Sequence, residues 1–394
     1  MHNWIISSTI QTIVLIFIGL TSVDSFAQSK IDYPVLSYYT HVGKAVNNYA
    51  AMDSFPKRNP AWVQELNFAI QTNGKKDWHK AWGLPQIGIA LVVGNWGNDR
   101  QIGNGYGIVP NITFSKNRAR YSLRLTLGLG LSYFPVMYDS ITNPYDILIG
   151  SHITNMSYFR ADFGFKLSDN LMFTLGAGSF HCSNGHYQVP NLGLNAPVGN
   201  IGIVFTPKSR PEWTKQKQRL DINRKSRFLV SSGIGVHEFA ETTGPVGGPK
   251  YPMATITVAW AKRAANRSLV SVGLNAKYYS NFHEYIKDKD YFATHHIWNA
   301  STINVFLGHE FVMNRFSLLT NGGIVLHNPF YLKYYETREK NFFNFVETYI
   351  CTKLGVRHYF GDVKMQKSNF FIGTFVHAKF GTADFIEMEF GLVF

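Results

Sequence analysis

The sequence predicts an all-β fold, an antiparallel transmembrane outer-membrane β-barrel of about 14 strands within a range of roughly 12 to 16. Three observations predict it. Only 16% of the residues are charged, whereas 15% are aromatic. No apolar run after the N-terminal segment reaches the length of a membrane-spanning helix. Several segments alternate between apolar and polar residues, as strands do when one face meets lipid and the other a lumen. A secreted soluble β-protein is the alternative.

The clearest alternation lies in 120-RYSLRLTLGLGLSY-133. One face carries leucines between two tyrosines, and the other carries Arg120, Arg124 and small or polar residues. A soluble sandwich rarely places arginines behind a leucine row, whereas a transmembrane barrel strand does. The pattern recurs in residues 159–167, 270–278 and 386–394. We expect four charged side chains to form a network inside the barrel: Arg120, Arg124, Arg160 and Asp162.

The chain is predicted to have three parts. Residues 1–27 read as a cleaved signal peptide, because Ile10 to Leu20 is an apolar core of signal length and Ser25-Phe26-Ala27 fits a cleavage site. An uncleaved anchor is the alternative. Residues 28–60 are expected to form a periplasmic or plug-like lead-in, and residues 61–394 the transmembrane barrel. These features predict export to the bacterial cell outer membrane.

Connections between the predicted strands are alternately short and long. The short ones are 116–119, 168–170, 262–267 and 313–315. The long ones are 136–156, 184–199, 281–299 and 327–344. Bacterial barrels have short periplasmic turns and long outer loops, so this alternation fits the predicted fold. The connection 208–226 is longer than expected for a turn.

Charge and cysteine content narrow the expected partners. The formal net charge is +13, which favours anionic partners such as lipopolysaccharide phosphates. We find no nucleic-acid motif, and export argues against a nucleic-acid partner. Cys182 and Cys351 give no disulfide framework. His295-His296 has no matching ligands nearby in the sequence and reads as part of a solvated loop.

One polar stretch, 180-FHCSNGHYQVPNLGLN-195, interrupts this pattern. Strand phase places His181 and Ser183 on the lipid-facing row and Cys182 on the opposite, lumenal face. An imidazole near a serine hydroxyl can take its proton and activate it as a nucleophile. A third group must orient the imidazole, and Asn191 and Asn195 are both candidates. The short turn before this strand places the pair at the strand's outer end, near the outer leaflet.

The stretch also resembles known lipid esterases. The run H-C-S-N-G followed by P-N-x-G-x-N is similar to the active-site region of the PagL-like lipid A 3-O-deacylases, which have His and Ser two apart and a Glu twelve after the Ser. It is also similar to outer-membrane phospholipase A, which has H-x-S-N-G and an Asn twelve after the Ser. Here that position is Asn195, as in the phospholipase. Pro190 to Gly193 and the upstream 143-NPYDILIGSHITN-155 resemble the deacylase and acyloxyacyl hydrolase-like members instead.

The resemblance implies a carboxylic ester hydrolase with Ser183 as nucleophile, His181 as general base and Asn195 as the group that orients the imidazole. Asn184 and the backbone near Gly185 would donate hydrogen bonds to the oxyanion. The resemblance implies that the chain removes an acyl chain from lipid A. Phospholipase A activity and a non-catalytic porin are the alternatives. No cofactor is expected, except calcium if the chain is phospholipase-like. The expected state is a membrane-embedded monomer or homodimer.

Overall fold

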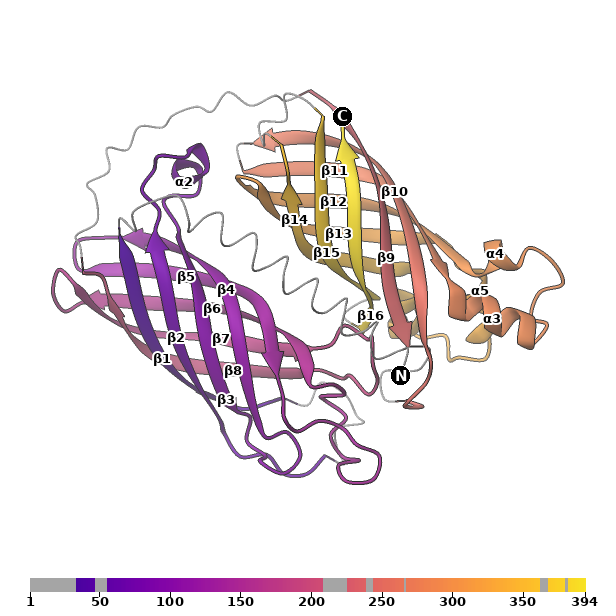
Figure 1. The fold of residues 1–394 in the computed structure, drawn as a ribbon, viewed down its shortest axis with the longest axis horizontal. Coiled ribbons are helices and arrows are strands. Elements are labelled where there is room, and N and C mark those ends of the chain that lie inside the picture. Colours follow the sequence, from indigo (N-terminus) through magenta and orange to yellow (C-terminus); the bar gives the residue numbers. More distant parts are fainter. Residues whose placement is uncertain are drawn as a thin grey trace. The chain divides into compact units, whose positions relative to one another are not determined.

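The computed structural model describes residues 33–46, 55–207, 225–238, 244–265, 267–361, 368–379 and 382–394. The predicted signal peptide lies outside them. The chain divides into two compact units, and each contains one closed barrel of eight antiparallel strands (Figure 1). The expectation of an all-β antiparallel architecture is therefore confirmed, but the single barrel of about 14 strands is wrong.

The first barrel is a simple meander in which each strand pairs with its neighbour in sequence and β1 closes the barrel by pairing with β8. Its strands are β1 (Pro34–Gly43), β2 (Ala61–Gln71), β3 (Gln86–Asn95), β4 (Asn104–Asn117), β5 (Tyr121–Tyr133), β6 (Ile153–Lys166), β7 (Leu171–Ser183) and β8 (Leu194–Phe205). A short helix, α2 (Asp77–Ala81), lies in the β2–β3 connection.

The second barrel repeats this topology, with β16 closing onto β9. Its strands are β9 (Arg227–Glu238), β10 (Lys250–Ala265), β11 (Ser268–Tyr279), β12 (Ser301–Met313), β13 (Phe316–His327), β14 (Ile350–Tyr359), β15 (Asn369–Lys379) and β16 (Thr382–Val393). Four short helices lie in two of its long connections: α3 (Ser280–Asp288), α4 (His296–Asn299), α5 (Pro329–Tyr334) and α6 (Phe342–Tyr349). The second unit also includes Gly185–Val189.

Two boundary predictions need correction for the same physical reason. The residues 28–60 expected as a lead-in include β1, which is a full barrel strand hydrogen-bonded on both edges. The residues 61–394 expected as one barrel contain most of the first barrel and all of the second. Alternation along a strand is local, but barrel closure depends on pairing between strands distant in sequence. The connection 208–226 lies between β8 and β9 in the sequence, and residues 208–224 of it lie outside the described residues.

The middle of the first barrel is filled by a buried charge network. Arg160 Nε donates to Asp162 Oδ2 at 2.8 Å, and its Nη1 donates to Glu65 Oε2. Arg124 Nη2 donates to Gln86 Oε1 at 3.0 Å. Arg160 and Asp162 thus pair inside the barrel as predicted, whereas Arg124 is buried there but its hydrogen bond is to the neutral Gln86. Arg120 lies just before β5 and is exposed, so the prediction for Arg120 is wrong.

An apolar cluster fills the end of the first barrel where its long connections lie. Phe180 and Cys182 of β7 belong to it, together with Phe134, Leu148 and Ile149 of the β5–β6 connection. This packing anchors the end of β7 and the loop beside it to one core. The site described below is therefore built on a rigid strand end and not on a free loop.

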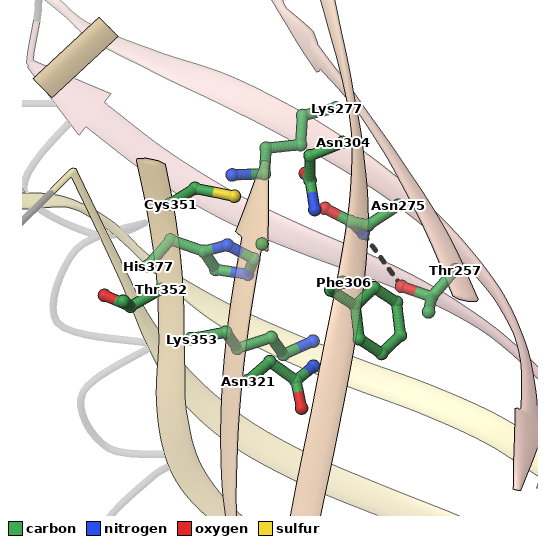
Figure 2. A pocket seen from close by; sticks show the side chains of 11 residues that line it. Thr257, Asn275, Lys277, Asn304, Phe306, Asn321, Cys351, Thr352, Lys353 and His377 are labelled. Atoms are coloured by element: carbon green, nitrogen blue, oxygen red, sulfur yellow. Dashed lines mark hydrogen bonds between the residues drawn. The ribbon is translucent and has the colours of Figure 1, made fainter. Parts of the chain in front are cut away.

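The interior of the second barrel is polar and charged. Arg357 Nη2 lies 2.9 Å from Glu389 Oε2, and Lys353 Nζ lies 2.6 Å from Glu387 Oε2. Figure 2 shows Lys277, Lys353 and His377 extending into one small cavity. A barrel of eight strands is just wide enough for side chains to fill.

Two further observations concern the whole described part of the chain. Cys182 and Cys351 are both buried and free, and they lie in different barrels. Among the described residues, no helix is long and apolar enough to cross a membrane.

Candidate active site

His181 and Ser183 lie at the end of β7, on the row that faces out of the first barrel. Farther down the same row, Phe173 and Leu175 are exposed apolar side chains. Cys182, between the two site residues, is completely buried on the inner face. The predicted phase of this strand is therefore confirmed. Ser183 is only 8% exposed, although it continues the outward row, and Asn191 and the backbone at Gly193 lie close to it.

Asn195 lies directly opposite His181 in the register between β7 and β8. The His181 Nδ1 and Asn195 Oδ1 atoms are 2.8 Å apart. Because the Asn195 oxygen accepts, His181 Nδ1 carries the proton in this arrangement and Nε2 keeps its lone pair. This is the tautomer that a general base requires. The sequence leaves open whether Asn195 reaches His181, and the structure brings the two side chains into contact.

Asn191, the other residue considered for orienting the imidazole, contacts Ser183 instead. Its Nδ2 donates to Ser183 Oγ at 3.2 Å, and its Oδ1 accepts from the backbone N–H of Asn184 at 3.0 Å. Asn191 therefore joins the predicted nucleophile to the predicted oxyanion residue. Spacing alone did not assign this role, because it depends on how the loop folds back over the strand end.

Asn184 is held firmly beside Ser183. Besides the bond from its N–H to Asn191, its Nδ2 donates to Ser151 Oγ at 3.2 Å. Gly185, the second predicted oxyanion residue, has a φ of +65°, a left-handed conformation that favours glycine. The following residue, His186, also has a positive φ of 70°. The chain thus turns sharply immediately after the strand end.

The segment covering the pair requires a glycine at position 193. Gly193 has a φ of +74°, and a Cβ there would lie 3.3 Å from His181 Cε1 and 3.4 Å from Ser183 Cβ. The backbone therefore approaches both side chains closely. Two hydrogen bonds hold it in place: Leu192 N donates to Ile147 O at 3.1 Å, and Gly193 N donates to Leu148 O at 3.2 Å.

The supporting loop, residues 134–152, is organised around Asp146. This carboxylate is fully buried, and its Oδ1 accepts from the N–H groups of Leu148 at 3.3 Å and Ile149 at 3.2 Å. Burial raises the pKa of Asp146 to about 8, despite these two hydrogen bonds. Asp146 lies in the 143–155 stretch whose resemblance to lipid esterases was noted from the sequence. That resemblance was the only sequence signal for this loop.

Among the described ranges, no group of three or more His, Cys, Asp or Glu side chains is arranged to hold a metal ion. His295 and His296 begin the short helix α4, where His296 Nε2 contacts the Phe292 carbonyl at 2.9 Å.

Fold and site together define a class of protein: an all-β chain of two closed barrels whose first barrel carries a His-x-Ser pair, oriented by an asparagine, on its outer rim. Each of the two barrels matches the model of a known protein family. The family described as lipid A 3-O-deacylase (PagL) matches residues 64–204, and acyloxyacyl hydrolase, C-terminal domain, matches residues 226–394. The first match lies in the first barrel and contains the whole His-x-Ser region, and the second spans the second barrel.

Several solved structures are also similar. The outer membrane enzyme PagL shares 11% identity, with 42% of this chain and 97% of that chain covered and a TM-score of 0.31. The toluene transporter TodX of Pseudomonas putida shares 11% identity over 92% of this chain and 88% of its own, with a TM-score of 0.17. The outer membrane protein opdK of Pseudomonas aeruginosa shares 8% identity over 92% of this chain and 98% of its own, with a TM-score of 0.21. No curated protein matches significantly.

Proposed function

We propose that this chain is an outer-membrane serine esterase that removes an ester-linked acyl chain from lipid A. The observation that carries the proposal is the 2.8 Å contact between His181 Nδ1 and Asn195 Oδ1, beside Ser183, in a domain of the PagL family. This contact leaves Nε2 as the nitrogen that accepts the proton of the serine hydroxyl. Asn195 orients the ring by a neutral hydrogen bond.

The proposed reaction has two steps. Ser183 Oγ attacks the ester carbonyl while His181 Nε2 takes the hydroxyl proton, which passes to the departing sugar or acyl hydroxyl. Water then attacks the acyl-serine ester, with His181 again as base, and releases a fatty acid. Asn184 and the Gly185 N–H are the proposed donors to the oxyanion in both steps. The backbone N–H of Asn184 is already donated to Asn191, so the proposed donor of Asn184 is its side-chain Nδ2. That nitrogen uses one of its two hydrogens in the bond to Ser151 Oγ, which fixes the side chain before substrate binds.

The position of the pair supports a lipid substrate. His181 and Ser183 continue a row whose lower members are exposed and apolar, so an acyl chain lying along the barrel wall brings its ester towards the rim. The net charge of +13 favours the anionic phosphates of lipid A over zwitterionic headgroups. The family match points to the same substrate.

A phospholipase A activity is the second candidate, and one residue favours it. Asn195 stands where the deacylase pattern has a Glu and the phospholipase pattern an Asn. Purified protein in detergent, given lipid A or phospholipid with calcium or with a chelator, distinguishes the two. Release of fatty acid from phospholipid alone, and only with calcium, would replace the lipid A proposal.

The direct test is a lipid A mass spectrum from cells expressing the wild type, Ser183→Ala or Ser179→Ala. Ser179 lies on the same outward row two residues before His181 and serves as the matched control. We expect wild type and Ser179→Ala to yield lipid A lacking one acyl chain, and Ser183→Ala to leave it intact. Equal deacylation by Ser183→Ala would refute the serine mechanism. If folded wild type leaves both lipids intact, a non-catalytic barrel becomes the better interpretation, and conductance in planar bilayers would test it.

A further inference from the structure

Helix α6 of the second barrel presents aromatic side chains to its surroundings. Phe342 is 70% exposed, Phe343 72% and Phe345 57%, whereas Val346 is the buried residue of this helix. The rings of Phe342 and Phe343 contact each other, with centroids 6.1 Å apart. Three exposed phenylalanines within four residues form a concentrated apolar surface. Such surfaces commonly mark contacts with a membrane or another protein.

This exposure is imposed by a well-determined local structure. Asn341 caps the helix, its side chain accepting from Asn344 N at 2.9 Å. Arg338 Nη1 donates to Glu347 Oε2 at 2.7 Å, which ties the preceding segment to the last turn. Thr348 Oγ1 donates to the Asn344 carbonyl at 2.7 Å. The polar residues are thus engaged within the connection, and the phenylalanines are left outside.

The aromatic surface has apolar neighbours on the barrel wall and in the next connection. Helix α6 lies against β13, β14 and β15. The outward row of β13 ends with two exposed residues, Ile324 and Leu326. His327 then contacts α4, where its ring lies 4.2 Å from that of Trp298, and Trp298 is itself exposed beside Ile297. Figure 1 shows α3, α4 and α5 gathered at one end of this barrel.

We propose that α6 and the exposed residues of α4 lie in the outer leaflet, at the boundary between acyl chains and headgroups. This rests on the proposed outer-membrane location. A lipid partner is favoured because the surface is continuous with the apolar wall of the barrel. Its charged neighbours form the pairs Arg338–Glu347 and Lys333–Glu336, and the exposed Glu339 and Lys340 before the helix carry opposite charges. These six side chains sum to no net charge, which gives little basis for recognising a charged partner. Aromatic side chains are typical of this depth in membrane proteins.

The test uses spin labels in the full chain reconstituted into vesicles of lipopolysaccharide and phospholipid. Labels are placed at Phe343→Cys, at Leu274→Cys on the outward row of β11, and at Thr337→Cys, an exposed polar position in the same connection as α6. Phe342→Cys is a second reporter if the first variant folds poorly. The native cysteines are buried, and unsubstituted protein gives the background. Accessibility to oxygen, which concentrates in lipid, is compared with accessibility to a water-soluble nickel complex.

We expect the oxygen-to-nickel ratio at position 343 to exceed that at 337 several-fold and to approach that at 274. A ratio at 343 equal to that at 337 places α6 in water and overturns the proposal. A label at 343 shielded from both reagents means that a protein surface or second copy covers α6, which also overturns it. A water-like ratio at 274 contradicts the membrane location itself. Because none of these readouts requires hydrolysis, loss of esterase activity does not affect the result.

Discussion

Replacing Asn195 by aspartate tests the role of the His181 contact most sharply, because the two side chains have nearly the same shape. In wild type, a neutral amide oxygen accepts from His181 Nδ1 at 2.8 Å. A neutral hydrogen bond contributes about 1 kcal/mol, whereas one to a charged group contributes about 1.5–3 kcal/mol. A carboxylate also stabilises the imidazolium that forms as Ser183 attacks. The gain in the transition state is therefore about 1 kcal/mol, or roughly fivefold in kcat/KM.

The matched variant is Asn195→Leu, which keeps the volume and removes the acceptor. This variant loses the hydrogen bond and the fixed tautomer of His181. We therefore expect it to lose about 1–2 kcal/mol of transition-state stabilisation, which lowers kcat/KM roughly 5- to 30-fold. The assay is fatty acid release from lipid A in detergent micelles, with folding checked by circular dichroism. If the aspartate variant is slower than wild type and the leucine variant is unchanged, Asn195 does not orient the base.

Three other predictions concern the support of the site and the barrel. Gly193→Ala should lower the free energy of unfolding by about 1–2 kcal/mol and should also lower activity, because residue 193 has a left-handed φ that alanine adopts only at a cost. Gly199→Ala, whose added Cβ would have its nearest neighbour at 3.9 Å, should change stability by less than about 0.5 kcal/mol in the same urea titration. The pKa of Asp146 is raised to about 8 in the folded chain, so the neutral carboxyl stabilises the folded state at low pH. This contribution to the free energy of unfolding is lost as the pH rises from about 4, the pKa of an unfolded aspartate, to about 8. Asp146→Asn should flatten that slope in unfolding measured from pH 5 to 9, and an unchanged slope would contradict this explanation. Arg160→Met should cost about 3–5 kcal/mol, because Glu65 keeps a buried charge without its cation, and a loss below about 1 kcal/mol would count against the network.

The parts of the fold that the sequence predicts well are those set by local alternation. β5 was expected over 120–133 and forms over Tyr121–Tyr133, because its leucine row fixes which face is apolar. The phase of β7 was correct for the same reason, so His181, Ser183 and Cys182 were placed on the right faces. The contact between His181 and Asn195 followed once the two strands paired across one loop.

The parts that were missed depend on long-range contacts. Closure of β8 onto β1 joins residues more than 150 positions apart, and no local pattern records that pairing. Local alternation therefore predicts only a lead-in where β1 forms. The bridge from Asn191 to Ser183 depends on a loop folding back over the strand, supported by Asp146. The helices α3 to α6 are short and stabilised by packing, so their sequences carry weak helical signals.

The separate closure of the two barrels has a consequence for biogenesis. Each hydrogen-bonded strand pair in the described part of the chain joins strands of the same barrel, so these strands seal each cylinder without a strand of the other. The last strand, β16, ends next to the aromatic Phe394 and seals only the second cylinder. The first is sealed by β8, in the middle of the chain. Assembly therefore comprises two closure events in one polypeptide, and a defect in the C-terminal strand leaves the sealing of the first cylinder intact.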